Sequence, residues 1–166
     1  MPLNLEDKKS IVAEVHAVAD KAFSAVAAEY RGLSVGEMTE LRVKARNSGV
    51  YMRVVKNTLA RRAVEGTEFE CMKDGMVGPL VLAFSQEEPS SAARLIRDFA
   101  KAHDKLVVKV GAFGGQMLSP KELDKLANMP TRDQALSLLL AVMKAPVEKL
   151  ARTLAAVRDQ KQATAA

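Results

Sequence analysis

The sequence is poor in the residues that most often carry chemistry. Its 166 residues include one cysteine, two histidines and no tryptophan. A single cysteine, Cys71, excludes a disulfide within the chain, and it is more typical of a small core residue than of a reactive thiol. His16 and His103 lie too far apart in sequence to indicate a metal site. We therefore expect no metal and no cofactor.

Long apolar runs are missing as well. The longest uninterrupted one, Leu138–Met143, is far short of the roughly 18 to 20 residues that span a membrane. The acidic pair Glu6-Asp7 near the start does not resemble a signal peptide. These absences predict a cytoplasmic protein with no membrane partner.

The motifs of enzymes are absent too. The chain contains no glycine-rich phosphate loop, no cluster of carboxylates, and no serine or cysteine beside a histidine motif. We therefore expect a protein that is not an enzyme and has no catalytic residue.

What the sequence does contain is a regular alternation of helical and strand patterns. Apolar residues make up 48% of the chain, enough to bury one core and leave a few dozen residues over. The periodicity predicts helices over residues 7–22, 34–47, 59–64, 89–103 and 119–128, and strands over residues 23–30, 50–55, 80–84 and 106–112. The predicted fold is α/β, with a mixed sheet covered by helices and a long C-terminal helix kinked near Pro146.

Local signals mark where three of these helices begin. Ser34–Glu37 and Ser119–Glu122 each match a capping box, in which serine and glutamate hydrogen-bond each other's amides. Asn57 or Thr58 should cap the short helix that follows the second strand. The regular part of the third strand should begin after Pro79, because proline cannot donate a ladder hydrogen bond.

Positive charge is concentrated in one segment. Between Arg31 and Arg62 there are eight basic and two acidic residues, a net charge of +6, whereas the whole chain carries +5. The rest of the chain is therefore nearly neutral, and this concentration favours a polyanionic partner. The alternative is an ordinary solvated face whose charges pair with acidic neighbours, which are scarce within the segment.

The strand over residues 50–55 and the turn after it should carry the contacts. We expect its even-numbered residues to face the core and the odd-numbered ones, Tyr51, Arg53 and Val55, to point outward. Residues 56–58 lie where the next helix begins, so that their side chains and the helix amides would meet phosphate oxygens. Because only Tyr51 is aromatic there, the surface should bind folded RNA by backbone and shape.

The segment 131–166 has a different composition. It has no aromatic residue and is rich in alanine and leucine, which strongly favours a helix. One stripe of this helix, within about 100° of the helical wheel, is apolar, and it consists of Leu136, Leu139, Leu140, Met143, Val147, Leu150, Leu154 and Val157. Leu138 and Val142 form a second apolar patch on the opposite side. Pro146 divides the stripe in two, which indicates two docking sites.

Something must cover that stripe, and three covers are conceivable. A membrane-surface helix usually carries bulky aromatics and abundant lysine, whereas this segment has six basic and three acidic residues and no aromatic. The stripe could pack back on its own domain, although Met129-Pro130 separates the two. Binding to partner helices is the interpretation that we favour.

Several motifs, in order and at the right spacing, resemble one known family. They are Tyr30-Arg31-Gly32-Leu33-Ser34-Val35, Met38-Thr39-Glu40-Leu41-Arg42, the stretch Val50–Ala63 with its Lys56-Asn57-Thr58-Leu59 motif, and the strand at Gly78-Pro79. From about Leu5 to Lys161 the chain resembles bacterial large-subunit ribosomal protein ten, the base of the ribosomal stalk. One departure is Leu80, where a threonine commonly follows the proline.

The resemblance implies an N-terminal α/β domain over residues 1–130 that binds 23S rRNA in the GTPase-associated centre, next to ribosomal protein eleven. It implies a C-terminal helix over residues 131–166 that anchors two dimers of stalk protein seven/twelve, whose mobile domains engage translation factors. It also implies repression of its own operon through the mRNA leader. The RNA-binding residues that it implies are Arg53, Lys56, Asn57, Thr58, Arg61 and Arg62, followed by Arg31, Lys8 and Lys9.

From the residues alone a second interpretation stays open. A non-ribosomal RNA-binding adaptor with a helical docking tail would share the basic segment and the apolar stripe.

Overall fold

Five strands form an antiparallel sheet at the centre of the N-terminal part of the chain. The computed structural model describes residues 4–165, with side chains through residue 162. The strands are β1 Ser24–Glu29, β2 Val50–Val54, β3 Leu80–Ser85, β4 Val107–Phe113 and β5 Gln116–Leu118. They lie in the order β2-β3-β1-β4-β5, so that β2 and β5 are the edges. β5, which the periodicity did not predict, is only three residues long.

The predicted α/β class is confirmed, but the sheet is antiparallel throughout and not mixed. β1 and β2 run in the same direction and are joined by α2, Val35–Asn47. β3 is inserted between them and pairs with both, since Val81 lies opposite Ala28 on one side and Val54 on the other. The two strands joined by the crossover are therefore not neighbours, and no parallel pair forms.

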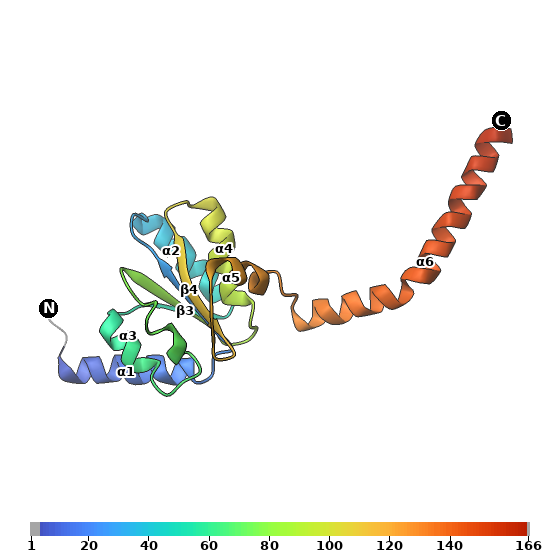
Figure 1. Cartoon of the computed structure of the whole chain (residues 1–166). Helices are drawn as coiled ribbons and strands as arrows, with labels where there is room; N and C mark the ends of the chain where they lie inside the picture. The colour runs from blue at the N-terminus through green and yellow to red at the C-terminus, as the bar shows by residue number, and fades with distance from the viewer. Residues whose placement is uncertain (1–3, 166) are drawn as a thin grey trace. The chain divides into compact units, whose positions relative to one another are not determined.

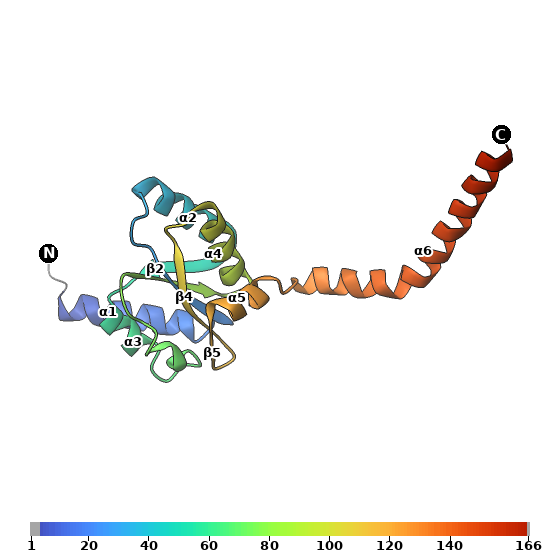
Figure 2. The same cartoon turned by 45° about the horizontal axis from the view of Figure 1, so that its top comes forward.

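Helices cover both faces of this sheet (Figure 1, Figure 2). One face carries α2, α4 (Ser91–Ala102) and α5 (Pro120–Ala127), and the other carries α1 (Leu5–Ala19), α3 (Asn57–Ala63) and the short 3-10 helix η1 (Glu70–Met72). Successive residues of β1 alternate between the two cores, with Val26 in the first and Ala27 in the second. Because helices cover both faces of the sheet, side chains on both sides of β1 and β3 are buried. This explains why consecutive residues of these strands are apolar.

Both predicted capping boxes are confirmed. At the start of α2 the amide of Ser34 donates to the Glu37 carboxylate at 2.6 Å, and the amide of Glu37 donates to Ser34 Oγ at 3.3 Å. At the start of α5 the amide of Ser119 donates to the Glu122 carboxylate at 2.8 Å. Gly49 follows α2 with a φ of 63°, the left-handed conformation that glycine adopts without strain.

The predicted cap of α3 is wrong. The helix begins at Asn57, two residues before the predicted start, and Lys56 is its N-cap residue without a side-chain cap. Asn57 Nδ2 donates instead to the carbonyl oxygen of Gly78 at 2.8 Å. A tertiary hydrogen bond to the loop before β3 has thus taken the place of the local cap.

The chain divides between Met129 and Pro130 into two compact units, and the second is a single helix. This helix, α6, spans Arg132–Ala165. At its start the amide of Gln134 donates to Thr131 Oγ1 at 3.3 Å, and the amide of Thr131 donates to Gln134 Oε1 at 3.2 Å. The helix contains Pro146, and its ribbon bends near the middle (Figure 1), which confirms the predicted kink.

Candidate nucleic-acid interface and docking helix

The basic segment surrounds one edge of the sheet. β2 is the edge strand, with α2 on one face of the sheet and α3 on the other. On the α2 side, Arg42 and Arg46 line a pocket beside the strand. On the α3 side, Lys56 lines a second pocket, together with Thr58 and Tyr30. Cations from three consecutive elements therefore meet at this edge.

The prediction of which side chains along β2 face the core and which face solvent is wrong in part. Val50 and Met52 do pack in the core beneath α2 and α4, but Val54 is 40% exposed. Tyr51 and Val55 pack against the second core instead of pointing to solvent. The reason is the second layer of helices, which covers the face that the sequence pattern assigned to water.

Arg53, one of the expected RNA-binding residues, is already engaged within the protein. It forms an ion pair with Glu14 of α1, and its Nη1 donates to Tyr51 Oη at 3.2 Å. The Tyr51 hydroxyl donates to Glu14 Oε1 at 2.8 Å. The hydrogen bonds from Tyr51 and then Arg53 hold the pKa of Glu14 below its ordinary value, and burial raises the pKa of Tyr51. The acidic partner comes from outside the basic segment.

Replacing Glu14 with glutamine should remove a small, pH-dependent contribution to stability. Because folding lowers the pKa of Glu14 from its ordinary 4.5, this contribution is complete above that pH and is lost as the pH falls through the lowered value. In urea unfolding, Glu14→Gln should be less stable than wild type at about pH 7, and the two should converge in acid. A difference that persists unchanged at about pH 3 would contradict an ionic origin.

The other expected RNA-binding residues lie on or near α3. Lys56, Thr58, Arg61 and Arg62 are exposed, and Arg61 Nη2 donates to the Met76 carbonyl at 2.9 Å. Asn57 is partly buried, and its side chain donates to the Gly78 carbonyl, as described above. Arg31 follows Tyr30, which lines the same pocket as Lys56.

Lys8 and Lys9, far from the basic segment in sequence, approach it in space. They line a groove between α1 and α3 together with Arg62. His16 connects the two helices, since its Nδ1 donates to the carbonyl oxygen of Ala63 at 2.8 Å. The groove extends the cationic surface from β2 and α3 onto α1.

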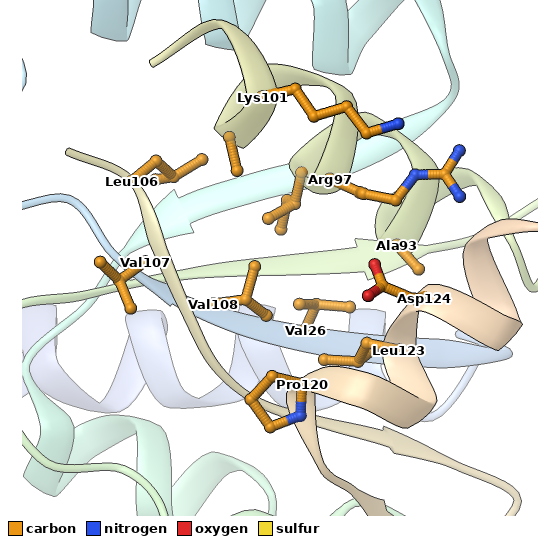
Figure 3. A pocket seen from close by; sticks show the side chains of 12 residues that line it. Val26, Ala93, Arg97, Lys101, Leu106, Val107, Val108, Pro120, Leu123 and Asp124 are labelled. Atoms are coloured by element: carbon orange, nitrogen blue, oxygen red, sulfur yellow. The ribbon is translucent and has the colours of Figure 1, made fainter. Parts of the chain in front are cut away.

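A further pocket lies between α4, β4 and α5 (Figure 3). Its lining is mostly apolar, with Leu106, Val108 and Leu123 among the contributors, and the charged side chains on it have both signs, as Lys101 and Asp124 show. Mixed charge gives no preference for a polyanion. We therefore leave this pocket out of the candidate interface.

Every residue of the predicted stripe on α6 is exposed. The exposed fractions of its eight apolar side chains lie between 49% and 73%. Leu138 and Val142 of the second patch are exposed by 57% and 68%. An exposed row of apolar side chains of this length is typical of an interaction site.

The described residues contain neither a membrane-spanning helix nor a cluster of potential metal ligands. Within residues 4–165 no helix is both long and apolar enough to cross a membrane. The same residues hold no group of three or more histidine, cysteine, aspartate or glutamate side chains placed to bind a metal ion.

The fold and these two surfaces are typical of a scaffold protein, which binds other molecules at separate surfaces. Cations gather at the sheet edge of one unit, and an apolar stripe lies uncovered on the helix that forms the other. Comparison with known proteins specifies the class. The family model Ribosomal protein L10 matches residues 3–101, and the model Ribosomal protein uL10 C-terminal region matches residues 129–164. The chain belongs to the ribosomal protein L10 family.

Full-length relatives from bacteria support the same assignment. Proteins named large ribosomal subunit protein uL10 are 69% identical in Thioalkalivibrio sulfidiphilus and 63% identical in Methylococcus capsulatus, and the alignments cover 98% or more of this chain and 99% or more of each relative. The protein of that name from Erwinia tasmaniensis is 58% identical over the whole of both chains. The resemblance found in the sequence is confirmed, and the family is structural, so the expectation that the chain is not an enzyme is confirmed as well.

Proposed function

We propose that this protein is the base of the ribosomal stalk. Membership of the family makes it a structural constituent of the large ribosomal subunit and places it in the cytoplasmic ribosome. Residues 1–130 bind 23S rRNA in the GTPase-associated centre, beside ribosomal protein eleven. Residues 131–166 anchor two dimers of stalk protein seven/twelve.

The surface around β2 supports the rRNA-binding part. Within the described residues, neither Lys56 nor Arg62 forms an ion pair or a side-chain hydrogen bond, so both charges are available to phosphates. Arg53 keeps further donors beside its contacts with Glu14 and Tyr51, because a guanidinium has five. A polyanion would gain several contacts here without breaking an existing ion pair.

The exposed stripe of α6 is the single observation that carries the docking part. A lone helix cannot bury an apolar stripe, and helix-in-groove recognition uses anchors at this spacing. The bend at Pro146 separates the anchors into two sets, which supports two dimers. Those dimers would present the domains that translation factors contact.

Repression of the protein's own operon follows from the same surface. An mRNA leader is a polyanion like rRNA, so the residues around β2 would serve both ligands. Competition between the two would then link synthesis of the protein to the supply of free rRNA.

Sedimentation with large ribosomal subunits at high salt tests the proposal as a whole. A stalk base should stay with the subunit after a salt wash that strips loosely bound proteins, because it is held by both RNA and protein contacts. Quantitative release into the supernatant would favour the non-ribosomal adaptor with a docking tail.

A chain that ends at Pro130 should separate the two activities. It retains every strand and both capping boxes, so we expect cooperative unfolding and wild-type affinity for rRNA, with complete loss of stalk-protein recruitment. Thermal unfolding, rRNA binding and co-purification measure the three properties. Loss of cooperative unfolding would show that the stripe packs on the first unit.

A further inference from the structure

The groove between α1 and α3 combines an apolar interior with charge of one sign. Aliphatic side chains line it, and they are Leu5, Val12, Ala13 and Leu59. Leu59 is only 6% exposed and forms the floor of the groove, whereas Leu5, Lys9 and Arg62 are exposed at its rim. The groove encloses about 340 Å³, and none of the described residues that line it is acidic.

The cations of this groove have no partner of their own. Within the described side chains, Lys8, Lys9 and Arg62 make no ion pair and no hydrogen bond, in contrast to Arg53. Their ligand should therefore be anionic at its periphery and apolar in its middle. A nucleotide lifted out of an RNA stack has this form, because phosphates flank a flat base.

Continuity with the neighbouring surface favours RNA over an acidic peptide. α3 carries Leu59 and Arg62 of the groove, and Lys56, the N-cap residue of the same helix, lies beside β2. An RNA backbone that follows the cations of α3 would pass the mouth of the groove. An unpaired base could then enter it without a change in the path of the backbone.

His16 also lines the groove, and its ring adds one polar preference. Its Nδ1 lies 2.8 Å from the carbonyl oxygen of Ala63, and a carbonyl oxygen only accepts, so Nδ1 carries the hydrogen. In the neutral imidazole Nε2 is then an acceptor. An acceptor suits the amino group of adenine, cytosine or guanine, which uracil lacks.

We propose that this groove holds one unpaired, amino-bearing base of the bound rRNA, with the flanking phosphates on Lys8, Lys9 and Arg62. The inference rests on the proposed rRNA binding and adds a base contact to it. It also explains how a surface with few aromatic residues can contact a base, because aliphatic side chains from two helices replace an aromatic platform.

Filling the groove tests the proposal without changing charge. Ala13 is exposed and lines the groove, so Ala13→Leu should occupy it, and leucine is a strong helix former that α1 should accept. Ala17→Leu is the matched control, because Ala17 is exposed on the same helix and does not line the groove. The probe is a protein-free transcript of the large-subunit rRNA.

We expect Ala13→Leu to weaken binding about tenfold, the size of one lost base contact. The slope of affinity against salt should be unchanged, because the same number of phosphates is neutralised. Ala17→Leu should bind like wild type. Dimethyl sulfate and kethoxal modify the pairing edges of unpaired bases, and one base that wild type and Ala17→Leu protect at saturation should react in the Ala13→Leu complex.

If Ala13→Leu and wild type bind with equal affinity and protect the same bases, the base pocket is overturned. If both still bind in a salt-dependent way, the proposed rRNA binding stays intact. Absence of salt-dependent binding in wild type would overturn both. Normal rRNA binding by Ala13→Leu with poor entry into reconstituted large subunits would assign the groove to a protein neighbour and would also overturn the base pocket.

Discussion

Two double substitutions in α6 should each remove one stalk-protein dimer and leave the other in place. Leu136→Asp with Leu140→Asp puts charge into the first half of the stripe, and Leu150→Asp with Leu154→Asp does so in the second. Burying one leucine side chain contributes about 1.5 to 3 kcal/mol, and a buried unpaired aspartate adds a penalty of its own. Losing two anchors of a half should therefore abolish its docking.

The length of the helix on each side of Pro146 sets the expected number of docked dimers. The stripe lies on residues 133–143 before Pro146 and on residues 147–160 after it. These segments of 11 and 14 residues are roughly 16 and 21 Å long at 1.5 Å per residue, which is room for one helical-hairpin dimer on each. Native mass spectrometry of the purified complex should find four partner chains with wild type and two with each double variant.

Ser137→Asp with Ala141→Asp is the matched control for the first half. Both residues are exposed and lie outside the stripe, so the same two charges should leave four partner chains bound. Six partner chains with wild type, or complete loss from either stripe variant, would rule out two independent docking sites.

Removal of three cations around β2 should weaken rRNA binding steeply. For the triple variant Arg53→Ala, Lys56→Ala and Arg62→Ala we expect most of the loss to come from Lys56 and Arg62, since Glu14 already holds Arg53. Each lost phosphate contact lowers the slope of log affinity against log salt by roughly 0.7 to 0.9, which is close to tenfold in affinity at about 0.1 M salt. The triple variant should therefore bind roughly 100-fold more weakly, with a slope lower by about two.

A control that removes the same number of charges elsewhere distinguishes a local binding site from an effect of net charge. Lys101, Lys121 and Lys125 are exposed on or next to α4 and α5, on the other side of the sheet, and their replacement by alanine removes the same three charges. Filter binding across a salt series should place this control near wild type. Equal losses in both triple variants would mean that net charge, and not the surface around β2, governs the affinity.

Local signals predicted most of the elements. The two serine–glutamate boxes, the start of β3 after Pro79 and the apolar stripe of α6 each depend on residues a few positions apart, where periodicity and capping chemistry act. The cap of α3 failed for the opposite reason. Asn57 is a good local cap, but Gly78, 21 residues later, offers its side chain a better partner.

The site itself depends on contacts that no local pattern contains. Tyr51 meets Glu14 across 37 positions, and His16 meets Ala63 across 47. The place of β3 between β1 and β2 brings α1 and α3 to the same face, and only that arrangement joins Lys8 and Lys9 to Arg62. The sequence indicated which residues are cationic, but it contained no signal for the groove they surround.

The edge position of β2 also matters for the protein before it is assembled. An edge strand exposes unpaired amide and carbonyl groups that can recruit a strand from another copy, and proteins counter this with short edges and charged residues. β2 has five residues, carries Arg53 and is followed by Lys56. Charged side chains on and beside the edge oppose edge-to-edge pairing, so the charges that we propose to bind RNA would also protect the newly made chain from aggregation until RNA covers them.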